Sequence, residues 1–599
     1  MSGVNTATIP FRFGPCELDE ARRSLSAHGR EIRLQPRVFD LLCYLVRHRD
    51  RVVTKDELLD ALWAGTVVVD NALQRVVSLA RTALAEAGLP EAVRTYPRHG
   101  YRFCLDEDAE PLAPVPTVTA AVGGDAVDAA LASAACERSD WDTACDLYAA
   151  ADAHVPLPAD DVEAWGRAAI CAGRGRSVAA ALERTVAERD AAGDTMAAAR
   201  GTLLLVQIRI DHKQSAMARG LLQRASRFLD GSGDRAERGH FSWMASRMAL
   251  ASGDSAAALS HADEACQLGR VLRDPDVECL GLVYRGHALM LKGDVSGGFA
   301  QHEEAAAVIR LGGVRSWVAG WALCSILYAA RHRCDWLRAA QFAEVFAEWS
   351  RTSRMPAFPG TCQLHRAAVL GARGELERAA SEVRAAAEML ARVAPWAEGD
   401  AFCVLGDIQL DLGDFDAAEA AFRQAHALGW DPMPGLARLH LLTGRPELAR
   451  RELERSLEEA DWTLRERRGQ LLCLLVHACI ASGDVDRARE ALSVLATDAQ
   501  MLATEALQAM HACAQATLAH HEGDFALASQ HLRRAVRHWR EAGSPVGEAD
   551  ARLRLAECLL KDRDSSGAEL ELHTVESQLA PSSLAHRAKL AALRECLAQ

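Results

Sequence analysis

The stretch Gly413-Asp-Phe-Asp-Ala-Ala-Glu-Ala-Ala-Phe-Arg-Gln-Ala425 shows the pattern that decides most of the fold of this chain. Gly413 can end one helix in a left-handed conformation, and the side-chain oxygen of Asp414 can cap the next helix. Ala418 lies five positions after the glycine, where a small side chain lets two helices approach closely. The apolar residues that follow recur at helical spacing. The stretch therefore predicts two helices joined by a tight turn.

This turn recurs through residues 125–599 with a period near 40 residues. Its anchors are Ser139, Gly175, Lys213, Gly253, Gly293, Cys334, Gly374, Gly413, Gly444, Gly483, Gly523 and Asp562. The residue five positions after each anchor is Ala or Gly: Ala144, Ala180, Ala218, Ala258, Gly298, Ala339, Ala379, Ala418, Ala449, Ala488, Ala528 and Gly567. One helix pair cannot bury its apolar face alone, so the pairs must stack. We predict a mostly α chain, with an α-solenoid of about twelve helix pairs. The segment resembles tetratricopeptide-type arrays and, in its period, the repeat domains of MalT-like bacterial regulators.

The first 105 residues have a different, mixed pattern. Residues 11–13 and 30–34 alternate polar and apolar side chains as strands do. Helical spacing follows from Val38 to Val46, a capping box opens a second helix at Thr54, and Asp70 can cap a third helix that runs to about Glu86. Residues 93–96 and 101–105 flank a hairpin turn. An acidic, Pro-rich linker, residues 106–124, separates this segment from the helical array.

Four blocks in this segment give it a family resemblance: Leu41-Leu-Cys-Tyr-Leu-Val46, Arg51-Val-Val-Thr-Lys-Asp-Glu-Leu-Leu-Asp-Ala-Leu-Trp63, Ser78-Leu-Ala-Arg-Thr-Ala-Leu84 and Arg94-Thr-Tyr-Pro-Arg-His-Gly-Tyr-Arg-Phe103. In order and spacing they resemble the OmpR/PhoB-type DNA-binding domain, an α+β winged helix. With a helical array and neither a receiver domain, a phosphate-binding loop nor a membrane helix, the layout resembles HilA-like regulators and, apart from the membrane helix, CadC-like regulators. We assign residues 1–105 to the winged helix, 106–124 to the linker and 125–599 to the array.

The resemblance implies that the third helix enters the major groove and that the wing reaches the adjacent minor groove or the backbone. A helix here buries Leu73, Val77, Ala80 and Leu84. The residues left to contact double-stranded promoter DNA are Gln74, Arg75, Ser78, Arg81 and Thr82 on the helix, and Arg94, Arg98, His99 and Arg102 on the wing. Arg75 can read guanine with two hydrogen bonds, or it touches phosphate only. Arg81 has a phosphate or an internal carboxylate as its expected partner.

Two features depart from the family pattern. Val76 and Leu79 stand where many members carry polar side chains, and they would favour protein docking if they were exposed. The apolar loop Gly65, Thr66, Val67 and Val68 corresponds to a loop that contacts RNA polymerase in some members. In this chain the loop is a polymerase contact, a dimer contact or part of the core.

Bulk composition favours a cytoplasmic regulator and gives no sign of an enzyme. The 17 cysteines form no C-x-x-C pair, which indicates reduced, buried thiols rather than disulfides or a metal site. Neither H-E-x-x-H nor G-x-S-x-G occurs, and we expect no catalytic residues and no cofactor. Residues 1–105 carry 15 Lys and Arg against 12 Asp and Glu, whereas the remainder carries 53 against 70. The overall charge of −14 is therefore an average of a basic and an acidic part.

We predict a sequence-specific transcriptional regulator, an activator by its resemblance, which acts as a dimer or on tandem sites. The array would sense a ligand or protein partner, or mediate self-association. An aromatic cluster at Trp317, Trp321, Trp336, Phe342, Phe346 and Trp349 is either inter-helix packing or a binding groove. The alternative function is a protein-interaction scaffold whose winged helix docks a protein instead of DNA.

Overall fold

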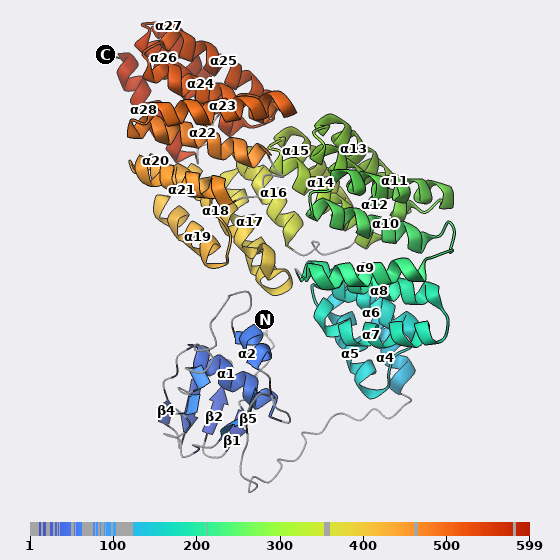
Figure 1. The fold of residues 1–599 in the computed structure, drawn as a ribbon. Coiled ribbons are helices and arrows are strands. Elements are labelled where there is room, and N and C mark those ends of the chain that lie inside the picture. The colour runs from blue at the N-terminus through green and yellow to red at the C-terminus, as the bar shows by residue number, and fades with distance from the viewer. Residues whose placement is uncertain are drawn as a thin grey trace. The chain divides into compact units, whose positions relative to one another are not determined.

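The structure is a computed structural model, and it divides into two compact units, Met1–Ala121 and Val122–Gln599. It describes residues 11–13, 16–19, 24–27, 30–32, 34, 36–49, 53, 55–62, 76–77, 80–81, 84, 89, 92–96, 100–103, 124–212, 214–352, 360–459, 465–578 and 583–598. Each unit is considered by itself below (Figure 1).

The N-terminal unit begins with a four-stranded antiparallel sheet in the order β1-β2-β3-β4. Its strands are β1 (Phe11–Phe13), β2 (Cys16–Asp19), β3 (Ser24–Ala27) and β4 (Arg30–Ile32). The register places Leu18 opposite Leu25, and both side chains are fully buried. The sequence pattern predicted the two outer strands and missed β2 and β3. Each of these has only four residues, too few for alternation to stand out.

Two helices, a hairpin and part of a third helix follow the sheet in this unit. The first two helices and the strands of the hairpin are α1 (Pro36–Arg47), α2 (Lys55–Leu62), β5 (Val93–Tyr96) and β6 (Gly100–Phe103). Leu41, Leu42 and Leu45 of α1 are fully buried, because they recur on one face of the helix and cover the apolar side of the sheet. One core therefore joins the strands, the helices and the hairpin.

The second unit contains twelve helix pairs followed by α28, within the part of the chain that the structure describes. The pairs are α4 (Gly124–Glu137) with α5 (Trp141–His154), α6 (Ala159–Cys171) with α7 (Gly175–Ala191), α8 (Thr195–Asp211) with α9 (Ser215–Phe228), α10 (Ala236–Ala251) with α11 (Ser255–Leu272), α12 (Pro275–Leu291) with α13 (Val295–Leu311), α14 (Ser316–His332) with α15 (Trp336–Thr352), α16 (Thr361–Ala372) with α17 (Leu376–Val393), α18 (Pro395–Leu412) with α19 (Phe415–Ala427), α20 (Gly435–Leu442) with α21 (Pro446–Glu459), α22 (Arg465–Ser482) with α23 (Val485–Leu502), α24 (Glu505–His521) with α25 (Phe525–Glu541), and α26 (Pro545–Lys561) with α27 (Ser565–Gln578), before α28 (Leu584–Ala598). The predicted solenoid is confirmed.

Among the predicted anchors that the structure describes, the turns follow the predicted chemistry with two corrections; Lys213 lies outside the described residues. Gly253, Gly293 and Gly413 are left-handed, and the aspartate after each accepts a backbone N–H at the start of the next helix. In the second and last pairs, however, the left-handed residues are Gly173 and Arg563, not the predicted anchors Gly175 and Asp562. The small-residue positions shift accordingly. Val178 and Ala568 are the buried residues, whereas Ala180 is exposed and Gly567 is half-buried.

The array bends back on itself, so that pairs far apart in sequence touch. Helix α16 contacts α26, and α18 contacts α28. The backbone N–H of Leu337 donates to the carbonyl of Ala542 at 3.0 Å. Gly543, with φ of +73°, sits at this contact, where an added Cβ would lie 2.6 Å from the Leu337 nitrogen. Glycine is therefore needed at Gly543 both for its backbone conformation and for the close approach.

Candidate nucleic-acid interface and array cavity

The frame of the N-terminal unit is held by hydrogen bonds between segments distant in sequence. Val53 and Tyr101 exchange two backbone hydrogen bonds of 2.8 Å, which adds a third strand segment to the β5–β6 hairpin. The Tyr44 hydroxyl of α1 donates to Glu57 of α2 at 3.0 Å. The hairpin and both helices are therefore fixed relative to one another.

The third helix lies against this frame through the face that the sequence predicted. Among its described residues, Val77, Ala80 and Leu84 are almost fully buried, as predicted. Val76 is half-buried and packs on the same core. Because Val76 contributes to the core, it does not provide the exposed apolar patch that would have favoured protein docking.

Arg81 has a structural contact. Its Nε donates to the carbonyl oxygen of Val93 on β5 at 2.9 Å, and the side chain is partly buried. The contact joins the third helix to the first strand of the hairpin. This contact of Arg81 with a backbone carbonyl is one that the sequence did not predict.

The hairpin pairs two arginines. Its register sets Arg94 opposite Arg102, between the pairs Val93–Phe103 and Thr95–Tyr101. Phe103 and Tyr101 are buried, and alternate strand residues point to opposite faces. The Arg94–Arg102 pair therefore occupies the register position of the outer face. The Nε of Arg102 donates to the carbonyl of Arg49 at 3.0 Å, which joins β6 to the end of α1.

The remaining predicted contacts lie outside the described residues. These are Gln74, Arg75, Ser78 and Thr82 of the third helix, Arg98 and His99 of the wing, and the loop Gly65, Thr66, Val67 and Val68. Leu73 and Leu79 also lie outside them.

A cavity of about 650 Å³ lies along the first helices of successive pairs in the array. Helices α8, α10, α12, α14, α16 and α18 all contribute to its lining. Its aromatic residues are Tyr284, Trp321, Tyr328, Trp396 and Trp430. A second cavity, of about 240 Å³, is lined by Trp243 and Trp317 among others. Both volumes and their mostly apolar linings suit small organic ligands, the larger one better.

The residues of the predicted aromatic cluster therefore fall into two groups, one that lines cavities and one that packs in or against the core. Trp317 and Trp321 line cavities, whereas Phe342 and Phe346 are buried and Trp336 and Trp349 pack against the core. Most of the lining did not follow from the sequence pattern, although the repeat register contains a signal for it. The residues six positions before the anchors at 213, 253, 293 and 334 are Gln207, Arg247, His287 and Tyr328, and each lines a cavity.

The charged groups around the larger cavity are paired with one another. Arg247 contacts Asp211 at 2.9 Å, and Arg333 contacts Glu466 at 2.8 Å. Arg331 binds both oxygens of Asp400 at 2.7 Å.

The pKa values of Asp400 and His287 show the effects of this pairing and of burial. Burial alone would raise the pKa of Asp400, but Arg331 lowers it to about 2. Burial holds the pKa of His287 well below its ordinary value, so this imidazole is neutral. The cavity therefore presents balanced charges and neutral rings.

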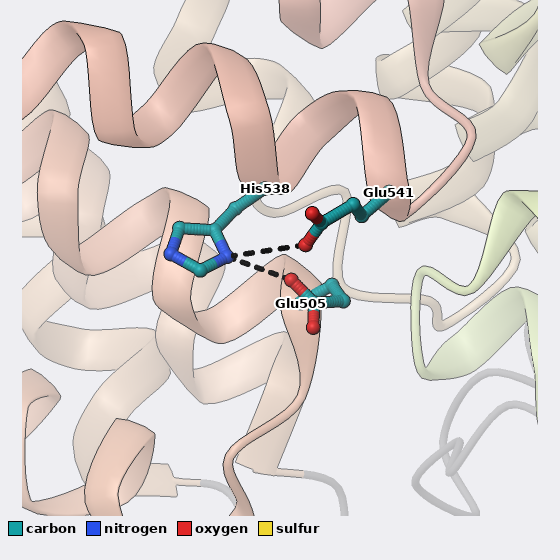
Figure 2. A group of neighbouring side chains, drawn as sticks. All are labelled: Glu505, His538 and Glu541. Atoms are coloured by element: carbon teal, nitrogen blue, oxygen red, sulfur yellow. Dashed lines mark hydrogen bonds and ion pairs between the residues drawn. The ribbon is translucent and has the colours of Figure 1, made fainter.

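One cluster of possible metal ligands lies elsewhere in the array, among the described residues. His538 Nδ1 lies 2.7 Å from Glu505 and 3.9 Å from Glu541, and Figure 2 shows both carboxylates turned toward this ring nitrogen. The two glutamates are 44% and 51% exposed. A hydrogen bond and an ion pair account for the geometry. We therefore assign the cluster the role of joining the start of α24 to the end of α25.

Comparisons with known proteins agree with both units. Residues 29–103 match the family described as transcriptional regulatory protein, C terminal, and residues 399–428, within α18 and α19, match the tetratricopeptide repeat. The resemblance of the N-terminal segment to OmpR/PhoB-type domains, and that of the array to tetratricopeptide repeats, are confirmed. No described helix is both long enough and apolar enough to cross a membrane.

Curated relatives match a short part of the chain. The transcriptional activator CadC of Escherichia coli is 28% identical over 96 residues, which is 16% of this chain and 19% of that protein. The phosphate regulon transcriptional regulatory protein PhoB of Rhizobium meliloti is 35% identical over 92 residues, 15% of this chain and 40% of that protein. The chain thus spans less than half the length of these relatives.

Two solved structures show a distant similarity to this chain. A Rap protein complexed with competence and sporulation factor aligns over 66% of this chain and 99% of that chain, with 14% identity and a TM-score of 0.38. The apo form of RapI aligns over 70% of this chain and 98% of that chain, with 9% identity and a TM-score of 0.30.

Proposed function

We propose that this protein is a DNA-binding transcriptional regulator whose N-terminal unit binds double-stranded promoter DNA. The observation that carries the proposal is the family match of residues 29–103. Its geometric support is the frame in which the third helix and the hairpin are joined through Arg81 and Val93. A helix and an adjacent hairpin held together in this way can engage a groove and the neighbouring backbone at once.

The base-reading role falls to the third helix. By helical spacing in the sequence, Gln74, Arg75, Ser78 and Thr82 are expected on the face opposite the buried residues Val77, Ala80 and Leu84. Arg75 is our choice for reading guanine, because a guanidinium can bind its O6 and N7 together. Arg81 donates a hydrogen bond from its Nε to the carbonyl of Val93, so it acts as a positioning residue. The same side chain can still contact a DNA phosphate.

The phosphate-binding role falls to the hairpin. The register sets Arg94 opposite Arg102, so two cationic residues occupy neighbouring positions on the hairpin. Cationic side chains at such positions can bind DNA phosphates. With Arg98 and His99 in the turn, the hairpin would thus fix the position of the protein on the duplex.

The array is the regulatory part in this proposal. Residues 1–105 would bind DNA, residues 106–124 would serve as the linker, and residues 125–599 would respond to an effector in the 650 Å³ cavity. We further propose an activator that acts in the cytoplasm as a dimer or on tandem sites. Its loop at Gly65, Thr66, Val67 and Val68 would contact RNA polymerase.

Footprinting of promoter DNA with the full-length protein at low salt tests the proposal. We expect a protected sequence whose affinity falls steeply with salt, because bound arginines displace counterions. No protection at any promoter would reject the proposal, and binding that salt leaves unchanged would favour protein docking.

Two substitutions separate reading from positioning. Arg75→Ala should relax the sequence preference at a cost of about 1–3 kcal/mol, whereas Arg98→Ala should weaken binding to all sequences alike. Equal, sequence-independent losses would reject the role of Arg75.

A further inference from the structure

Cys324 of α14 lies in a polar pocket of the array cavity. Its Sγ is 3.3 Å from the Oγ1 of Thr361, and both residues line the cavity together with His365. Cys362, on the same helix as Thr361 and His365, is fully buried and interacts with Cys324 through its side chain. Cys324 itself is half-buried and is one of the residues that line the cavity.

Two further residues, Arg331 and Asp400, orient His365. Arg331 donates to its Nδ1 at 3.2 Å, and Arg331 is held in turn by both oxygens of Asp400. Because Nδ1 accepts this hydrogen bond, the ring hydrogen is on Nε2, which can donate toward Cys324. The chain Asp400, Arg331, His365 thus ends at a ring that lines the same cavity as Cys324.

These neighbours favour the thiolate of Cys324. Its hydrogen bond with Cys362 has the largest effect, and with His365 and Thr361 it outweighs burial and holds the pKa of Cys324 well below the ordinary thiol range. Burial raises the pKa of Cys362, which therefore remains a thiol that can donate. By contrast, burial raises the pKa of Cys266 and of Cys334 to about 12. Thiolates are the nucleophilic form of cysteine.

The cavity selects the kind of molecule that reaches this sulfur. Its volume of about 650 Å³ far exceeds what a peroxide or a single ion fills. Tyr284, Trp321 and Tyr328 provide flat apolar surfaces on which planar rings pack. Among the described residues, Arg247 and Arg331 beside the cavity are each paired with an aspartate, which disfavours a ligand with a net charge.

We propose that Cys324 is a covalent modification site, at which its sulfur adds to an uncharged, planar α,β-unsaturated carbonyl compound bound in the array cavity. The inference gives a ligand class to the effector role proposed above and depends on that role only for its effect on DNA binding.

The addition is balanced without an oxidant or a leaving group. The thiol proton goes to solvent, and the thiolate forms one S–C bond at the β-carbon. The C=C π electrons move onto the carbonyl oxygen, and the resulting enolate takes up one proton from solvent. Thr361 and His365 are positioning residues that stabilise the thiolate before the attack.

The test treats full-length protein at pH 6 with limiting N-phenylmaleimide, an uncharged planar reagent of this class, and locates the adduct by mass spectrometry of peptides. Cys596, exposed on α28, is the matched comparator. We expect Cys324 to react about tenfold faster than Cys596, since thiolate character outweighs exposure. Charged iodoacetate should reverse the order. If both reagents labelled the exposed Cys596 faster than Cys324, the proposal would be overturned.

Three variants complete the test. Cys324→Ser should lose the fast adduct, and Cys596→Ser should retain it. His365→Gln should slow the reaction about tenfold at pH 6 but little at pH 9, where thiols ionise without help. Equal rates at both pH values would reject the role of His365.

Two further measurements distinguish a failure of the proposed modification site from a failure of the proposed effector role. A Cys324–Cys362 disulfide after hydroperoxide treatment, without any adduct from the maleimide, would overturn the ligand class. An adduct that leaves the DNA footprint unchanged would contradict the effector role of the array, while the modification site would stand.

Discussion

The two units of this chain are stabilised in different ways. The N-terminal unit has one small core and a few hydrogen bonds that join distant segments, such as Arg81 to Val93 and Val53 to Tyr101. The array repeats one helix pair twelve times and then closes through contacts such as Arg333 with Glu466, 133 positions apart. Single substitutions should therefore affect one unit and spare the other. Calorimetry that resolves two unfolding transitions would measure this difference.

The largest effect is expected at the buried ion pair of the array. Arg333 and Glu466 are 7% and 0% exposed. Glu466→Ala would leave a buried arginine without its partner and should lower the stability of the array transition by about 3–5 kcal/mol. The N-terminal transition should not move.

Glu522→Ala is the control for this substitution. Its partner Arg489 is more than half exposed, and because solvent screens such a pair, the array transition should hardly shift. Equal shifts for the two variants would contradict the view that burial decides the effect.

The closing contact of the array gives the next largest effect. Gly543→Ala combines a left-handed backbone with a Cβ placed against Leu337, and it should cost about 3 kcal/mol in the array transition. Gly523→Ala is the matched control, because Gly523 is also left-handed but has nothing within 4 Å of the added Cβ. Its cost should be only about 1–2 kcal/mol. Equal losses would show that the contact between α15 and the start of α26 contributes nothing.

Acid should weaken the array through its buried histidines. Burial lowers the pKa of His302, which is fully buried, to about 4. Below about pH 6.5 the imidazole of His302 binds a proton in the unfolded chain but stays neutral in the folded array. The free energy of unfolding therefore falls as the pH falls, and it is lower by about 2 kcal/mol at pH 5. His302→Gln should reduce the pH slope of the array transition by up to one proton. An unchanged slope would contradict the assignment.

The smallest effect belongs to the N-terminal unit. Arg81→Lys removes the Nε donor to Val93 and should lower the stability of that transition by about 1 kcal/mol, without any change in the array. A loss of DNA affinity with unchanged stability would instead assign Arg81 to the DNA, and the positioning role would be wrong.

Sequence periodicity predicted the array well, because each pair repeats the same local chemistry. A left-handed residue, a capping aspartate and a small residue five positions later recur within a few residues of one another. The prediction shifted at Gly175 and Asp562, where the true left-handed residues, Gly173 and Arg563, lie one or two positions away. Local patterns identify a turn more reliably than its central residue.

The site was less predictable than the fold. The buried face of the third helix, with Val77, Ala80 and Leu84, followed from helical spacing. The backbone partner of Arg81 did not, because it depends on how the helix meets β5. The cavity residues Cys324, His365 and Asp400 come from three separate helices, and only the repeat register hinted at such a lining.

The sequence by itself determined the division into a basic winged-helix segment and an acidic helical array, because composition, caps and periodicity are local properties. Only the tertiary structure decided which charges are paired and which thiol is activated. Arg331, Asp400 and His365 become neighbours of Cys324 through the stacking of α14, α16 and α18. Interactions across stacked helices depend on how side chains pack, and no spacing along the chain encodes that packing directly.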